Sequence, residues 1–153
     1  MCAILPSTRR PVRPFTPLLS DRIARMKKSL LLVAHGSRRQ ASNDEVRALT
    51  ERVRVEANER YAAIECAFLE LAEPSIPDGL EQLIDNGAAQ ITVLPYFLAA
   101  GRHVIEDIPE EVAVAQEKHP DIHIEIAPYL GTSETMPKLL LTMLADSATA
   151  DAD

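Results

Sequence analysis

The sequence predicts an α/β fold: a single open, mostly parallel four-stranded sheet with helices on both faces. Short apolar segments alternate along the chain with longer segments of helical periodicity, which is typical of this class. Segments 30–34 and 91–94 are continuous apolar runs, as expected of strands covered on both faces. Segment 122–127 instead alternates apolar and polar residues, as a half-exposed edge strand does. With right-handed crossovers, these textures favour the strand order 2-1-3-4.

The boundaries of the elements follow from local signals. The strands are expected at 30–34, 64–69, 91–94 and 122–127. The first helix is expected over 42–60, opened by a capping box of Ser42 and Glu45. The second is expected over 75–86, with Gly87 as its stop.

Two more helices are expected in the second half of the chain. One runs to about Lys118 after a loop through Gly101, with Asp107 as its N-terminal cap. The last helix carries apolar residues at helical spacing, and we expect them to be buried in the core: Met136, Leu139, Leu140, Met143 and Leu144.

Composition excludes several classes of function. The 153 residues are 46% hydrophobic and 25% charged, which is typical of one globular domain. No run approaches the roughly 18 apolar residues of a membrane span. Cys2 and Cys66 are too few for a disulfide framework, so we expect a cytoplasmic protein in which Cys66 is a reduced core thiol. The net charge of −7 argues against a nucleic-acid partner.

The two ends of the chain differ from its body. Residues 1–26 hold four prolines, five arginines and one acid. We interpret them as a flexible N-terminal extension, with a start placed too early and Met26 as the true start as a close alternative; a transit peptide is a weaker one. The folded domain is expected over 27–145, and 146–153 are expected to form a disordered acidic tail.

Three chemically active side chains follow neighbouring strands of the expected sheet. In such a sheet the ligand crevice opens at the carboxyl ends of the strands, where the winding reverses. His35 follows the first strand, Glu70 ends the second, and His103 lies after the third. Two imidazoles and a carboxylate suit a divalent transition metal such as Co²⁺, Ni²⁺, Fe²⁺ or Zn²⁺.

Each of these residues also has a structural interpretation. His35 can cap a helix or hydrogen-bond a loop, His103 can be a solvated loop residue, and Glu70 can stabilise the next helix N-terminus. His119 closes a helix and His123 faces solvent on the edge strand, so both are interpreted as structural. Spacing alone leaves these alternatives open.

Four stretches together resemble the small class II sirohydrochlorin chelatases. They are His-Gly-Ser-Arg at 35–38, Phe-Leu-Glu-Leu-Ala-Glu-Pro-Ser at 68–75, Leu-Pro through Gly-Arg-His at 94–103, and Asp-Ile-Pro-Glu at 107–110. That group includes short cobaltochelatases of cobalamin biosynthesis and ferrochelatases of sirohaem biosynthesis. The resemblance covers roughly 28–144.

The resemblance implies a function and a site. It implies that the protein inserts a divalent metal into sirohydrochlorin. His35 and His103 would be the catalytic residues, and His35, Glu70 and His103 would bind the metal. The metal is a substrate and no prosthetic group is expected. Co²⁺ is favoured, with Fe²⁺, as in a ferrochelatase, or Ni²⁺ as alternatives. A homodimer is expected because longer relatives fuse two such halves.

Further residues beside the crevice are candidates for binding the macrocycle. Its carboxylates would contact basic or polar side chains, for which the candidates are Ser37, Arg38, Arg39 and Arg102. Its ring would contact apolar side chains, for which the candidates are Tyr96, Phe97 and Leu98. The alternative is that these arginines are ordinary solvated loop residues.

Other classes of function fit less well. A hydrolase of the nucleophile-elbow type would need Gly-x-Ser-x-Gly, and a nucleotide binder would need a glycine-rich loop after the first strand; the sequence has neither. A non-catalytic carrier of Co²⁺ or Ni²⁺ is the main rival. It would bind metal without tetrapyrrole-dependent turnover.

Overall fold

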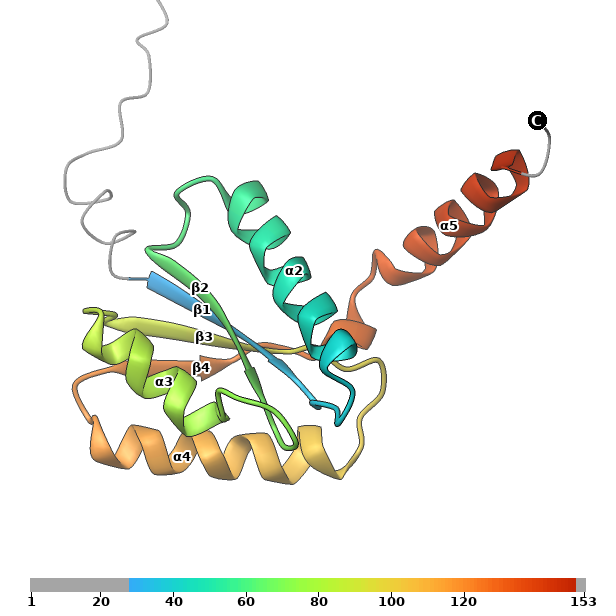
Figure 1. Ribbon diagram of the computed structural model, residues 1–153. Coiled ribbons are helices and arrows are strands. Elements are labelled where there is room, and N and C mark those ends of the chain that lie inside the picture. The colour runs from blue at the N-terminus through green and yellow to red at the C-terminus, as the bar shows by residue number, and fades with distance from the viewer. Residues whose placement is uncertain (1–27, 151–153) are drawn as a thin grey trace, which may run out of the picture.

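The computed structural model describes residues 28–150, so the expectation for 1–26 lies outside the described residues. Four parallel strands form one sheet in the order β2-β1-β3-β4, which confirms the predicted topology (Figure 1). The strands are β1 (Lys28–Ala34), β2 (Ala63–Phe68), β3 (Gln90–Pro95) and β4 (His123–Ile126). The helices are α2 (Gln40–Ala57), α3 (Ile76–Asp85), η1 (His103–Asp107), α4 (Ile108–Lys118), η2 (Leu130–Thr132) and α5 (Met136–Ala150).

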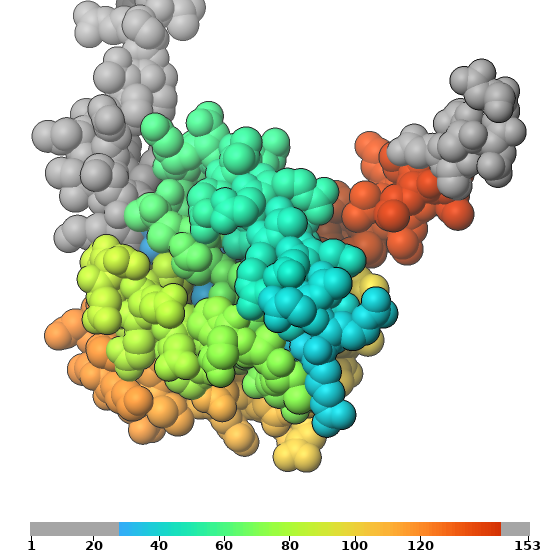
Figure 2. Space-filling view, viewed as in Figure 1, coloured from blue at the N-terminus to red at the C-terminus, as the bar shows by residue number. Residues whose placement is uncertain are grey.

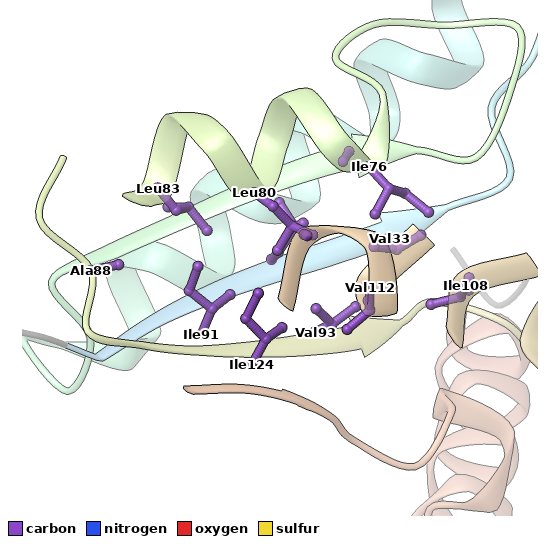
Figure 3. Packing of buried hydrophobic residues seen from close by; sticks show 13 residues of the cluster. Val33, Ile76, Leu80, Leu83, Ala88, Ile91, Val93, Ile108, Val112 and Ile124 are labelled. Atoms are coloured by element: carbon purple, nitrogen blue, oxygen red, sulfur yellow. The ribbon is translucent and has the colours of Figure 1, made fainter. Parts of the chain in front are cut away.

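Helices cover the two faces of the sheet unequally. α3 and α4 lie on one face and α2 lies on the other (Figure 1). The main core fills the space between the sheet and α3 and α4 (Figure 3). Its buried side chains include Leu31, Val33, Ile76, Leu80, Leu83, Ile91, Val93, Ile108, Val112 and Ile124.

Two smaller apolar clusters lie under α2. One joins Leu32 and Phe68 to Val46, and the other joins Ile64 to Ala57. The guanidinium of Arg47 stands 5.1 Å from the centre of the Phe68 ring. Cys66 is a buried free thiol, as predicted.

The predicted start is correct for α3 but wrong for α2. α3 begins as predicted, because Ser75 caps it and accepts a hydrogen bond from the Asp78 amide at 3.3 Å. The predicted capping box at Ser42 is wrong: α2 begins at Gln40, two residues earlier, and no side chain caps it. Instead, Ser37 Oγ accepts from the Arg39 amide, and the buried Asn43 donates to the Ser37 carbonyl at 2.8 Å.

The predicted helix that ends at about Lys118 also begins earlier than expected. A π-helical turn, η1, carries His103, and the Ile108 amide donates to the His103 carbonyl five residues back. Pro109 has no N–H for the carbonyl of Ile105, so regular α-helical bonding cannot run through this point. Asp107 therefore sits inside a continuous helix with no cap hydrogen bond, and its predicted role as a cap is wrong.

α5 departs most from expectation. Its start contacts η2, and the helix extends away from the body of the protein (Figures 1 and 2). Five of its side chains were expected in the core, which is wrong: Met136 is only half-buried, and Leu139, Leu140, Met143 and Leu144 are 51–65% exposed. Residues 146–150, expected in a disordered tail, continue this helix. Among the helices of the described residues, none has the length and apolar character to cross a membrane.

Candidate functional site

Backbone hydrogen bonds hold the segments that follow β1 and β2 together, at a turn that contains Gly36. Beyond the strands, the Leu69 amide donates to the Ala34 carbonyl and the Glu70 amide to the His35 carbonyl, at 2.9 and 3.0 Å. Gly36 has φ +92°, and a Cβ at this position would stand 1.8 Å from the Glu70 carbonyl oxygen. Only glycine fits this conformation and this contact. The loop after β1 is thus fixed against the loop after β2.

This turn brings His35 beside both other predicted site residues. His35 Nε2 lies 3.4 Å from Glu70 Oε1. The His35 and His103 rings stand edge to face, with centroids 4.8 Å apart and an interplanar angle of 83°. The loops after β1 and β2 and the start of the helix that leads into α4 lie at the same edge of the sheet (Figure 1). The three side chains thus come together at the edge where the strand order placed them.

The side chains at this edge are not arranged as a complete metal site. Within 28–144, where side chains are described, no three His, Cys, Asp or Glu residues stand ready to hold a metal ion. His35 and Glu70 are about half exposed and His103 is more than one-third exposed, so their rotamers are not fixed by packing. The metal-ligand assignment of His35, Glu70 and His103 stays a prediction.

Asp107 holds His103 in a defined orientation. Its Oδ2 lies 2.6 Å from His103 Nδ1, and its side chain is 27% exposed. Since an ionised carboxylate only accepts hydrogen bonds, the neutral imidazole in this pair carries its hydrogen on Nδ1 and keeps the free lone pair on Nε2. A carboxylate that orients an imidazole in this way is a common support for a metal ligand. Sequence reasoning missed this role, because the four-residue spacing is informative only if the helix begins before His103.

The predicted substrate-binding residues occupy different environments. Arg38 and Arg39 are exposed at the start of α2, and Ser37 is partly buried. Arg102 Nε lies 3.2 Å from Glu106 Oε2 and 3.7 Å from Asp107 Oδ1, so it stands on the same turn as His103.

The apolar candidates after β3 also differ among themselves. Tyr96 and Leu98 are exposed, at 39% and 72%. Phe97 packs against the main core instead, and its carbonyl accepts a hydrogen bond from the Gly131 amide at 2.9 Å. Tyr96 and Leu98 are therefore the side chains of this loop that a ligand can reach, and Phe97 anchors the loop.

The other two histidines lie away from this edge. His119 ends α4 and its Nε2 is 2.9 Å from Glu81 Oε2. His123 pairs in register with Gln90, the first residue of β3, and therefore sits at the opposite, amino-terminal edge of the sheet. Both positions agree with a structural interpretation, and His123 is a suitable control for substitutions at the site.

The family of the chain follows from a match to the CbiX family model over residues 29–147. The chain belongs to the CbiX family. The match takes in the four strands, except for the first residue of β1, and the segments that carry His35, Glu70, His103 and Asp107.

The relatives of this CbiX chain are named for two different metals, iron and cobalt. The chain is 33% identical over 121 residues to the sirohydrochlorin ferrochelatase of Bacillus subtilis, an alignment that covers 79% of this chain and 46% of that protein. It is 37% identical over 92 residues to the sirohydrochlorin cobaltochelatase of Methanocaldococcus jannaschii, covering 60% and 63%. The chain thus spans about half to less than two-thirds of the length of these relatives.

Solved structures share the fold. The CbiX protein from Marinobacter aquaeolei matches with a TM-score of 0.69 and 28% identity, over 80% of this chain and 98% of that one. The sirohydrochlorin chelatase SirB from Bacillus subtilis subspecies spizizenii, solved in complex with cobalt, matches with a TM-score of 0.71 and 34% identity, over 78% of this chain and 50% of that one. The predicted fold class is therefore confirmed.

Proposed function

We propose that this protein is a sirohydrochlorin chelatase that inserts Co²⁺ into the tetrapyrrole in cobalamin biosynthesis. The observation that carries the proposal is the meeting of His35, Glu70 and His103 at the carboxyl edge of the sheet, with Asp107 orienting His103. Membership of the CbiX family supports it, as do relatives named for both sirohydrochlorin and a metal.

Metal capture is the first step of the proposed reaction. His35, Glu70 and His103 together replace part of the water shell of the incoming cation. Two imidazoles and a carboxylate suit Co²⁺ and Fe²⁺ alike. His103 is the ligand best prepared for this step, because the Asp107 carboxylate holds Nδ1–H and leaves Nε2 to bind.

Proton removal is the second step, since a macrocycle that receives a divalent metal releases two pyrrole protons. Imidazole accepts protons readily near neutral pH, so a histidine is a suitable acceptor. We assign this role to His35, which lies beside the Glu70 carboxylate that can stabilise the imidazolium. His35 then leaves the ion and accepts one of the two protons, the second proton passes to solvent, and His103 retains the ion until the ring nitrogens bind it.

Recognition of the macrocycle must rely on local contacts. Sirohydrochlorin carries eight carboxylates and the chain has a net charge of −7, so long-range attraction is absent. Arg38, Arg39 and Arg102 stand exposed around the site and would pair with peripheral carboxylates. Tyr96 and Leu98 would contact the ring.

Two finer points belong to the same proposal. Cobalt is favoured because the chain resembles the short cobaltochelatases and is 37% identical to one cobaltochelatase, whereas iron is supported by the ferrochelatase relative at 33% identity. A homodimer is proposed because this chain matches half of the SirB chain, so that two copies would supply a SirB-like length.

The test is an anaerobic insertion assay that follows the absorbance of sirohydrochlorin with Co²⁺, Fe²⁺ or Ni²⁺. We expect Co²⁺ insertion well above the uncatalysed rate, lost in His35→Ala and in His103→Ala and retained in His123→Ala. Faster insertion of Fe²⁺ would identify a ferrochelatase instead.

Direct Co²⁺ titration separates the two histidines. His103→Ala should lose most of the affinity for the ion, and His35→Ala should lose insertion rate more than affinity. Tight metal binding without any acceleration by the unmodified protein would make it a metal carrier and overturn the proposed reaction.

A further inference from the structure

α2 is bonded to both of the loops that carry the first two candidate ligands. The loop between β1 and α2 carries His35, and the loop between β2 and α3 carries Glu70. Two polar side chains of α2, Asn43 and Arg47, each donate a hydrogen bond to one of these loops. They are four residues apart, so they are neighbours on one side of the helix. One side of α2 therefore reaches both loops.

Asn43 holds the loop after β1. Its side chain is buried, at 3% exposure, and its Nδ2 donates to the Ser37 carbonyl at 2.8 Å. Loss of this bond would leave a buried donor without a partner, so the bond is strongly preferred. Ser37 lies two residues after His35, with Gly36 at φ +92° between them. Asn43 thus fixes the end of the tight turn that begins at His35.

Arg47 holds the loop after β2. Its Nη2 donates to the Glu73 carbonyl at 2.7 Å, and its Nη1 donates to Asp44 Oδ1 at 2.9 Å. The guanidinium also stands over the ring of Phe68, the buried last residue of β2. The Phe68 amide donates to the Pro74 carbonyl at 2.9 Å, which closes the base of the same loop. The start and the end of the loop are therefore both anchored under α2.

The loop after β2 is held in a conformation that costs free energy. Leu71 has φ +63°, in the left-handed region that a non-glycine residue seldom adopts. Its side chain is 52% exposed, so burial of Leu71 does little to offset this cost. Bonds at neighbouring residues must hold the conformation instead. One is the bond from the Glu70 amide to the His35 carbonyl, and another is the bond from Arg47 to the Glu73 carbonyl.

We propose that Asn43 and Arg47 are positioning residues that hold His35 and Glu70 face to face. Each acts through a backbone carbonyl of a loop and touches no ion itself. His35 Nε2 and Glu70 Oε1 are 3.4 Å apart, which is the separation of two atoms that each bind one tetrahedral ion at about 2.1 Å. This positioning role rests on the proposed function, in which His35 and Glu70 bind the ion.

The first test measures hydrogen exchange of the Glu70 amide in the metal-free protein. That amide bonds to the His35 carbonyl, so its exchange reports whether the two loops stay together. Arg47→Met keeps an apolar chain beside Phe68 but removes both donors, and Asn43→Ala removes the other bond. Each should speed the exchange about 10-fold, because local opening then costs less free energy. Unchanged exchange in either variant would overturn the proposal.

Two residues of the same helix provide matched controls. Arg54 also donates from α2 to a backbone carbonyl, but that carbonyl belongs to Ile64, at the other end of β2 from the site. Thr50 is also buried and polar, but it donates to the Val46 carbonyl within its own helix. Arg54→Met and Thr50→Ala should lower stability to urea without speeding the exchange. A general loss of stability is thereby separated from opening of the two loops.

The second test is Co²⁺ titration of the same four variants. Asn43→Ala and Arg47→Met should each weaken binding about 10-fold, the lower end of the loss when a residue that supports a ligand is removed. The visible absorption of bound Co²⁺ should change with them, since it follows the coordination geometry. Arg47→Lys should recover part of the affinity, because an ammonium group can still donate to the Glu73 carbonyl. Unmodified affinity and absorption in Asn43→Ala and Arg47→Met would overturn the proposal.

The two tests separate this inference from the proposed reaction. Faster exchange in both variants of a protein that binds no Co²⁺ would keep the positioning role and reject the metal site. Weaker Co²⁺ binding in both variants, with no insertion by the unmodified protein, would keep it and reject the chelatase. Loss of Co²⁺ in His35→Ala, with normal binding and exchange in Asn43→Ala and Arg47→Met, would keep the site and overturn the inference.

Discussion

At the scale of single residues, the pair of His103 and Asp107 is the most informative feature of the site. Their side chains are 2.6 Å apart across one helical turn, and Asp107 is the least exposed member of the polar cluster around His35. An Asp at this place fixes which imidazole nitrogen is free. It also fixes the direction of the ring, so that the free nitrogen points where a metal ion can be bound.

Replacement of Asp107 by Asn should weaken the site without unfolding the protein. An amide keeps the shape of the carboxylate but loses its charge and can also donate a hydrogen bond, so the His103 tautomer is no longer fixed. We expect Co²⁺ affinity and insertion rate to fall about 10- to 100-fold. Calorimetric titration and the absorbance spectrum of bound Co²⁺ measure the effect.

Glu106→Gln is the matched control for this substitution. Glu106 lies one residue away and pairs with Arg102, not with His103. It should change Co²⁺ affinity by less than about threefold, well under the loss expected when a supporting carboxylate is removed. If the two variants behaved alike, the orienting role of Asp107 would be refuted.

At the scale of elements, sequence patterns located the strands to within one or two residues but misplaced two helix starts. The helix expected over 75–86 begins within one residue of its predicted start, and there the Ser75 hydroxyl caps it by accepting from the Asp78 amide. Ser42 and Asp107 carry the same kind of signal, yet tertiary contacts decide their position. The Asn43 bond to the Ser37 carbonyl pulls the start of α2 back, and the π-helical turn extends the helix to Arg102.

α5 shows a different limit of sequence reasoning. Apolar residues at helical spacing correctly predicted a helix, but the pattern does not say against which surface the helix packs. Burial in the protein's own core was inferred, whereas the side chains face outward. A helix that packs on a second molecule has the same sequence pattern as a core helix.

The junction between β1 and α2 supports a prediction about glycine. Gly36 and Gly87 have nearly the same φ, +92° and +87°, but only Gly36 would bring its Cβ against backbone; at Gly87 nothing lies within 4 Å. Gly87→Ala should therefore cost only the left-handed strain, about 1–2 kcal/mol. Gly36→Ala should cost clearly more, because the Glu70 carbonyl must also move.

Urea unfolding of the two alanine variants measures this difference. The excess loss in Gly36→Ala should be accompanied by weaker Co²⁺ binding, since the same turn places His35 beside Glu70. Equal losses in the two variants would mean that the loops after β1 and β2 relax without cost.

At the scale of the whole molecule, the strand order did most to locate the site. His35, Glu70 and His103 are each more than thirty residues apart in sequence, and no local motif joins them. The order 2-1-3-4 places the carboxyl ends of β1, β2 and β3 together, so the sequence alone allowed His35, Glu70 and His103 to be grouped. The orientation of each side chain could not be predicted, because it depends on the π-helical turn and on the contact at Gly36.

Because the three candidate ligands come from three distant segments, a bound ion would stabilise the whole fold. A ligand that binds only the folded state adds about 2.7 kcal/mol at 100 times its dissociation constant. For a domain of this size that is a rise in Tm of roughly 5–10 °C.

We expect such a rise with Co²⁺ for the unmodified protein and for His123→Ala, whose substituted residue lies at the opposite edge of the sheet. In His35→Ala the rise should be smaller, and in His103→Ala it should be absent. Differential scanning calorimetry with and without Co²⁺ measures each value. Equal stabilisation of all three variants would place the ion elsewhere on the protein and refute the ligand set.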